Sequence, residues 1–104
     1  MLVTECKQDW ALLPDERRIR CLLVDDSPVA LRSVQSLLKY CGRVQIVATA
    51  ADGQEALEAV QTQGPDVVVM DVQMPRMSGL QAAAQIRQES PGTRVVLFST
   101  HDQP

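Results

Sequence analysis

From residue 19 onward the chain alternates short apolar runs with amphipathic stretches, and this alternation restricts its fold more than any other feature. Runs rich in valine, isoleucine and leucine predict strands, and apolar residues spaced three and four apart predict helices. The expected strands cover about 19–24, 44–50, 66–71 and 94–99, and the expected helices about 28–41, 54–63 and 79–89. Strands that alternate with helices are joined by right-handed βαβ crossovers, so the pattern predicts an α/β domain with a parallel sheet.

The length of 104 residues allows one small domain with its own core. Residues 1–18 show no sustained period and are expected to form an N-terminal arm that packs through Trp10, Leu12 and Leu13, whereas residues 19–104 form the domain. A net charge of -3 without any Lys/Arg run argues against direct nucleic-acid contact. Three cysteines without a CxxC pair, and a start without a signal peptide or membrane-spanning stretch, indicate a reduced cytoplasmic protein outside the membrane.

Acidic residues stand at the ends of two expected strands. Asp25 and Asp26 follow the first strand, and Asp71 ends the third. The carboxyl ends of parallel strands meet at one edge of the sheet, where ligands bind. Three neighbouring carboxylates repel one another, so we expect either raised pKa values or a hard cation such as Mg2+. A carboxylate beside such a cation can attack a phosphorus centre, and the product is an aspartyl phosphate.

Each of these acids also has a plain structural interpretation. An Asp pair before a helix is commonly a capping and turn pair, and a single Asp that closes a strand is commonly a turn residue. Ser99 and Thr100 close the fourth expected strand and place hydroxyl donors at the same edge. The combination of acids and hydroxyls at one sheet edge favours a functional site over turn chemistry.

Three segments, residues 22–26, 71–79 and 96–100, resemble the receiver domain of bacterial two-component response regulators. The stretch Asp-Val-Gln-Met-Pro-Arg-Met-Ser-Gly is the most distinctive of them. The resemblance covers about residues 19–104. It implies a doubly wound, flavodoxin-like parallel sheet with strand order 2-1-3-4 for the units that are present.

The resemblance implies a role for each residue of the site. Asp71 would accept a phosphoryl group from a histidine kinase or phosphotransfer protein. Asp26 would bind Mg2+ directly and Asp25 largely through water, with Asp71 and the backbone carbonyl of Gln73 completing the protein ligands. Ser99 would hydrogen-bond the phosphoryl group and shift a two-state equilibrium that controls an output domain or effector protein. The only chemistry implied is transfer to Asp71 and later hydrolysis, so the chain is not expected to be an enzyme with a separate substrate.

The sequence ends before the family's fifth strand, which carries a lysine that contacts the phosphoryl group, and before its fifth helix. We therefore expect a C-terminally truncated receiver with weakened phosphoryl stabilisation, whose exposed edge strand forms a homodimer or a swapped dimer. Two alternatives stay open. One is a phosphorylation-independent protein interaction module or inactive receiver fragment. The other, a magnesium-dependent phosphatase, is the least favoured, because Gln73 stands where a general acid would be needed.

Overall fold

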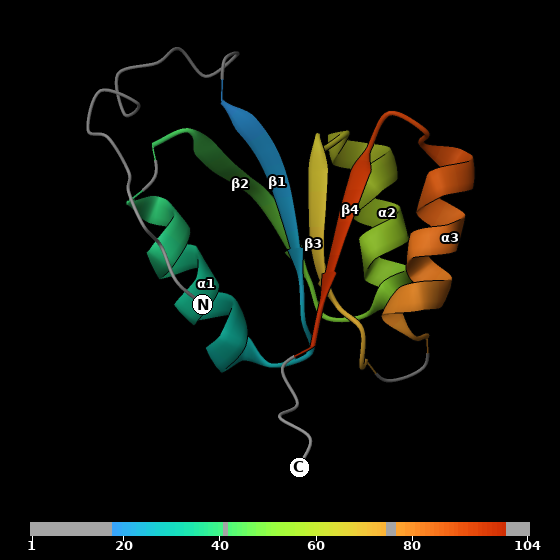
Figure 1. Cartoon of the computed structure of the whole chain (residues 1–104), viewed down its shortest axis with the longest axis horizontal. Coiled ribbons are helices and arrows are strands. Elements are labelled where there is room, and N and C mark those ends of the chain that lie inside the picture. The colour runs from blue at the N-terminus through green and yellow to red at the C-terminus, as the bar shows by residue number, and fades with distance from the viewer. Residues whose placement is uncertain (1–17, 41, 75–76, 100–104) are drawn as a thin grey trace.

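The computed structural model describes residues 18–40, 42–74 and 77–99, and it shows one sheet with helices on both of its faces (Figure 1). The elements in chain order are β1 (Ile19–Val24), α1 (Pro28–Lys39), β2 (Val44–Ala50), α2 (Gly53–Gln63), β3 (Val67–Asp71), α3 (Gly79–Glu89) and β4 (Arg94–Phe98). All strand pairs are parallel, in the order β2-β1-β3-β4. This confirms the predicted doubly wound α/β fold and strand order. The expected packing of Trp10, Leu12 and Leu13, and the position of Thr100, lie outside the described residues.

Side-chain caps fix where α1 and α3 begin. The Ser27 hydroxyl accepts a hydrogen bond from the Ala30 N–H at 3.2 Å, and Pro28 is the first residue of the helix, where its missing N–H leaves no bond unmade. At the start of α3, Ser78 and Gln81 form a capping box, with two hydrogen bonds of 3.2 Å that run in opposite directions. These caps anchor the loops that leave β1 and β3. The first loop carries Asp25 and Asp26, and the second follows Asp71 at the end of β3.

The first helix was predicted to extend to about residue 41, just before Gly42, and it is shorter than that. The helix ends at Lys39 and Tyr40 is its C-cap. The Tyr40 N–H donates to the Leu37 carbonyl at 3.3 Å, which tightens the last turn and closes the helix before the glycine is reached. The other predicted boundaries differ from the observed ones by a single residue or not at all.

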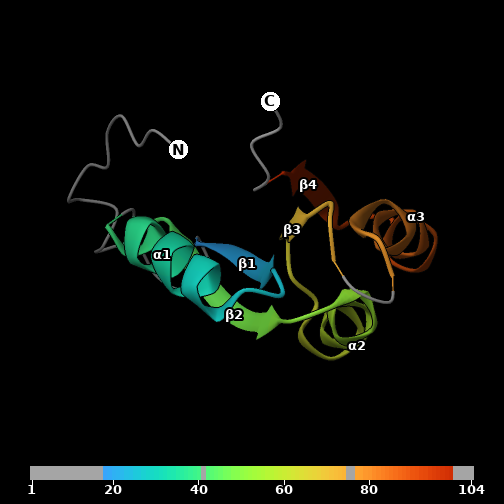
Figure 2. The same cartoon turned by 90° about the horizontal axis from the view of Figure 1, so that it is seen from below.

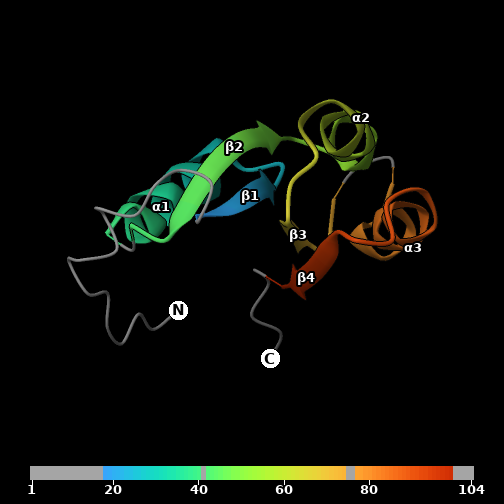
Figure 3. The ribbon, with the colours of Figure 1, turned by 90° about the horizontal axis from the view of Figure 1, so that it is seen from above.

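Most of the hydrophobic core lies on one side of the sheet, and Cys21 and Leu23 are buried outside this main cluster. Figures 2 and 3 show α2 and α3 together on one face and α1 alone on the other. The core under α2 and α3 contains Leu22, Val24, Ala50, Ala56, Leu57, Val60, Val68, Met70, Ala82, Ala83 and Ile86. No residue of α1 is fully buried. The two faces of the sheet are therefore covered unequally within the described part of the chain.

The strand order brings the predicted site together. β1 lies between β2 and β3, so the chain leaves β1 toward one edge of the sheet and later returns to its other side. Val24 pairs with Met70, and the residue that follows each of them is an aspartate. Asp25 and Asp71 therefore lie side by side at the carboxyl ends of neighbouring strands. This is the reversal point of strand order at which parallel α/β sheets bind ligands.

Candidate functional site

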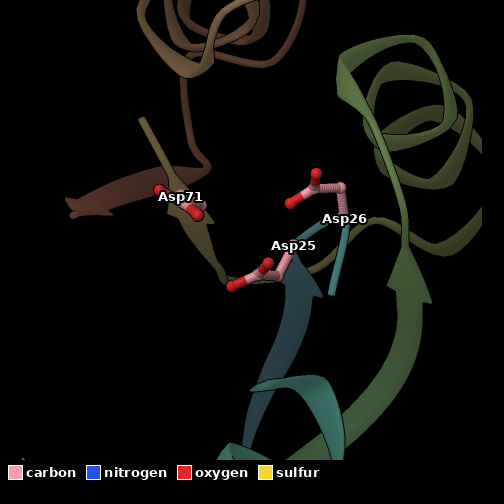
Figure 4. A group of neighbouring side chains, drawn as sticks. All are labelled: Asp25, Asp26 and Asp71. Atoms are coloured by element: carbon pink, nitrogen blue, oxygen red, sulfur yellow. The ribbon is translucent and has the colours of Figure 1, made fainter. Parts of the chain in front are cut away.

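Three aspartates gather at the carboxyl ends of β1 and β3 (Figure 4). Asp25 and Asp26 lie on the loop between β1 and α1, and Asp71 is the last residue of β3. One carboxylate oxygen from each of them lies within 4.8 Å of the others. The sequence-based prediction that these three residues meet is confirmed.

Asp25 is one of the buried residues of the cluster. Its Oδ1 accepts a hydrogen bond from the Ser27 N–H at 2.9 Å, and the side chain is almost entirely buried. Its Oδ2 is also buried and has no hydrogen-bond partner among the described residues. Burial raises the pKa of Asp25, the negative charges of Asp71 and Asp26 raise it further, and the Ser27 N–H acts in the opposite direction. The charged form of Asp25 is therefore unfavourable, and a bound cation would stabilise it.

Asp71 is 1% exposed, whereas Asp26 is an exposed residue. The Oδ1 of Asp71 accepts a hydrogen bond from the Gln73 N–H at 3.1 Å, so the loop after β3 turns back onto the carboxylate. The cluster thus has a buried floor, made by Asp25 and Asp71, and an open side at Asp26. A small ligand can reach it from solvent through that side.

Ser99 lies at the same end of the sheet. β4 pairs with β3 so that Phe98 lies opposite Asp71, and the Val72 N–H donates to the Phe98 carbonyl at 2.8 Å. Ser99 is the next residue and its side chain is exposed. The predicted hydroxyl therefore stands one position beyond the residue that faces Asp71, on the neighbouring strand.

Gly79 supports the site but received no role in the sequence analysis. It is the first residue of α3, and its N–H donates to the Val72 carbonyl at 2.8 Å. A methyl group here would collide with the Asp71 carbonyl and lie 2.9 Å from the Val72 Cα. The helix can approach the loop behind Asp71 only because this residue has no side chain. The Ser-Gly pair at the helix start was the available signal, but it did not reveal how close the loop would be.

The donor set fits a hard divalent cation. Mg2+ prefers oxygen ligands, commonly one or two carboxylates with retained waters. The cluster offers three carboxylates, one of them with a buried oxygen that has no hydrogen-bond donor in the described part of the chain, and it is open on one side. No helix in the described ranges is long and apolar enough to cross a bilayer.

A parallel α/β domain with an acidic cluster at its reversal point has the architecture of a ligand-binding domain. Comparison with known proteins identifies its family. The response regulator receiver domain matches residues 21–104, so the chain belongs to the family of response regulator receiver domains. The resemblance found in the sequence motifs is confirmed. Acidic clusters that bind Mg2+ and accept phosphate are typical of this family.

The chain is similar to segments of several longer proteins. The chain is 40% identical over 91 residues to the probable transcriptional regulatory protein NarL of Mycobacterium tuberculosis, covering 88% of this chain and 42% of the relative. It is 38% identical over 90 residues to protein-glutamate methylesterase/protein-glutamine glutaminase 5 of Geobacter metallireducens, covering 86% of this chain and 25% of that protein. The chain therefore spans less than half the length of these curated relatives.

Solved structures of receiver domains resemble the structure of the chain. The signal receiver domain of NarL from Mycobacterium tuberculosis superposes with a TM-score of 0.78 at 40% identity, over 85% of this chain and 71% of that one. The response regulator domain of Thermotoga maritima CheB gives a TM-score of 0.77 at 36% identity, over 81% of this chain and 62% of that one. These domains share the flavodoxin-like α/β fold of the chain.

Proposed function

We propose that the chain is a phosphoacceptor receiver, in which Asp71 takes a phosphoryl group from a phosphohistidine of a histidine kinase or phosphotransfer protein. Asp26 would bind Mg2+ directly, Asp25 largely through water, and Asp71 and the Gln73 carbonyl would complete the ligands. The observation that supports this role is the buried Asp71 carboxylate, which closes a central strand within 4.8 Å of two further carboxylates.

The transfer step follows from the position of Asp71. A carboxylate oxygen attacks phosphorus, and the new O–P bond forms as the P–N bond to the donor imidazole breaks. The imidazole nitrogen leaves with the electron pair and takes up a proton. The Gln73 N–H holds the other Asp71 oxygen, so the nucleophile is oriented before the donor arrives. A bound Mg2+ would supply positive charge to the phosphoryl oxygens.

Ser99 would respond to phosphorylation of Asp71 through a hydrogen bond. Its hydroxyl can donate a hydrogen bond to a phosphoryl oxygen if Ser99 moves toward Asp71, and it directly follows β4. Because Phe98 pairs with Asp71, that movement would change the end of β4 and the surface beside it. The end of β4 would thus have two conformations, and phosphorylation of Asp71 would shift the equilibrium between them and so change how this surface contacts an output domain or effector protein.

The wider assignment is also a proposal. Residues 1–18 form an arm and residues 19–104 the receiver domain, which would work in the cytoplasm, where response regulators meet their kinases. The names of the relatives point to two classes of output, transcriptional regulation and methylesterase activity, each in a protein more than twice as long as the matched segment. The proposed receiver has no separate substrate, so its own catalysis is limited to gain and loss of phosphate at Asp71.

One experiment tests the acceptor. The intact mass is measured after incubation with acetyl phosphate and Mg2+, for wild type, for Asp71→Ala and for Glu58→Gln, which removes an exposed carboxylate on α2. One phosphoryl group should add to wild type and to Glu58→Gln but not to Asp71→Ala. Uptake by Asp71→Ala would refute the acceptor assignment. No uptake by folded wild type would instead favour the phosphorylation-independent interaction module.

We further propose that the open edge of β4 pairs with a second copy of the chain. Within the described residues β4 has one neighbour, β3, and Val96 on it is 50% exposed. Unpaired strand edges are templates for pairing with another chain. Light scattering should show a dimer that Val96→Lys dissociates and Leu80→Lys, at an exposed apolar position on α3, does not. A monomeric wild type at all concentrations would contradict this pairing.

A further inference from the structure

The flank formed by α1 and β2 lacks cover in the described part of the chain. α1 carries an apolar stripe, yet none of its residues is buried, and β2 is only partly buried from Val44 to Ala48. An amphipathic helix gains most of its stability by burying its apolar stripe. A flank with this much uncovered apolar surface calls for a further segment of polypeptide.

A groove runs along this flank. It has a volume of about 420 Å³ and lies between the C-terminal half of α1 and the start of β2. Leu38, Val44 and Ile46 form its apolar lining, and Arg18 and Lys39 add two basic groups. No acidic residue lines it. The groove therefore suits an apolar segment that is flanked by carboxylates.

The chain contains such a segment next to the groove. Residues 9–16 read Asp-Trp-Ala-Leu-Leu-Pro-Asp-Glu, which places four apolar residues between acids and includes no basic residue. The segment connects to the described chain at Arg18, which itself lines the groove. Leu13 lies five residues before Arg18, so an extended chain lets it reach up to about 18 Å from that residue. Pro14 favours an extended conformation of the residue before it.

We propose that residues 9–16 fold back onto the α1/β2 groove of the same molecule. Trp10, Leu12 and Leu13 would pack against its apolar lining, and the flanking acids would lie near Arg18 and Lys39. This contact supplies the missing cover for α1 and ties the start of β1 to the end of α1. It does not depend on phosphorylation of Asp71, because the groove lies at the opposite end of α1 from the acidic cluster.

Tryptophan fluorescence of the full chain tests the proposal, because Trp10 is the single tryptophan. In folded wild type the emission should be blue-shifted, and quenching by acrylamide should be several-fold weaker than in urea. Leu38→Asp removes apolar lining and Lys39→Glu reverses one basic group, so both should move quenching toward the value in urea. Arg87→Glu, which reverses an exposed charge on α3, is the matched control and should leave quenching unchanged.

The outcomes separate the proposal from its rivals. Quenching of folded wild type that equals the value in urea would overturn it, as would equal quenching in Lys39→Glu, Leu38→Asp and Arg87→Glu. Protection that disappears on dilution would place the arm on a second copy and would also overturn it. Far-UV circular dichroism verifies that each variant is folded. If Leu38→Asp does not fold, Lys39→Glu, at an exposed position, decides the question.

Discussion

Replacing Gly79 with alanine tests how tightly α3 is fitted behind the acidic site. The added methyl group would lie 2.9 Å from the Val72 Cα and would collide with the Asp71 carbonyl. Carbon atoms at optimal separation lie about 3.5–4.0 Å apart. The helix start or the loop must therefore move by roughly 0.6–1.1 Å, since 3.5 less 2.9 is 0.6 and 4.0 less 2.9 is 1.1. Both partners in this contact are backbone, so no flexible side chain can move away instead.

The cost follows from that geometry. Overpacking a tight site typically costs about 1–3 kcal/mol, and a backbone contact belongs to the upper part of that range. Alanine regains at most about 1 kcal/mol through its higher helix propensity. The expected loss in the free energy of unfolding is thus about 2 kcal/mol. For a domain of this size that corresponds to a melting temperature lower by roughly 8–16 °C. In urea, the midpoint should fall by about 1 M, with the slope unchanged.

Equilibrium unfolding in urea, followed by circular dichroism, measures this effect. Gly92→Ala is the matched control, because a methyl group there meets no atom within 4 Å and its backbone conformation is not left-handed. The control should unfold within about 0.5 kcal/mol of wild type. If Gly79→Ala and Gly92→Ala had the same midpoint, the inferred contact between α3 and the loop after β3 would be refuted.

Three further perturbations have expected outcomes. Burial raises the pKa of Asp25 above its usual 3.8, so the folded state binds a proton on this carboxyl more tightly than the unfolded state does. As the pH rises, Asp25 becomes charged and the free energy of unfolding falls. With a chelator present, Asp25→Asn should therefore raise the urea midpoint near neutral pH, by a margin that narrows toward pH 4; equal midpoints near neutral pH would contradict this. Burial raises the pKa of the Cys21 thiol to about 11, so a thiol reagent near pH 8 should label Cys21 only after unfolding, and rapid labelling located at Cys21 by peptide mass mapping of the folded protein would count against its burial. Gly53→Ala places a methyl group 2.9 Å from the Met77 sulfur and 3.0 Å from the Met77 Cβ. These are side-chain atoms and part of that side chain is flexible, so the urea midpoint should fall less than that of Gly79→Ala, whose contacts are backbone.

The sequence predicted those features that depend on periodicity and on the rules of parallel sheets. The strand bounds follow from the apolar runs. The meeting of Asp25 with Asp71 follows because two of these runs lead into a carboxylate and parallel strands present their carboxyl ends at one edge. Ser27 was predictable as a cap because its function depends on residues within one turn.

Other features depend on contacts between elements and were not predictable in this way. The role of Gly79 arises from its distance to the loop after β3, which no local pattern encodes. The buried Oδ2 of Asp25, which has no hydrogen-bond partner in the ranges that the structure describes, depends on how its side chain is oriented among three acids. The end of α1 was misplaced because Tyr40 closes the last turn with a short-range hydrogen bond, while glycine is the more common stop.

The unequal cover of the two sheet faces has a consequence for motion. Segments with few buried apolar contacts open locally at lower free energy than the core does. α1 is such a segment, whereas β3 is packed under α2 and α3, so amide hydrogens of α1 should exchange faster than those of β3. Asp26 lies on the loop that leads into α1, and Asp71 belongs to β3. The acidic cluster therefore combines Asp26, beside a helix that can open locally, with Asp71, in a strand that opens only with the whole domain. A ligand bound to both residues would slow the hydrogen exchange of the α1 amides.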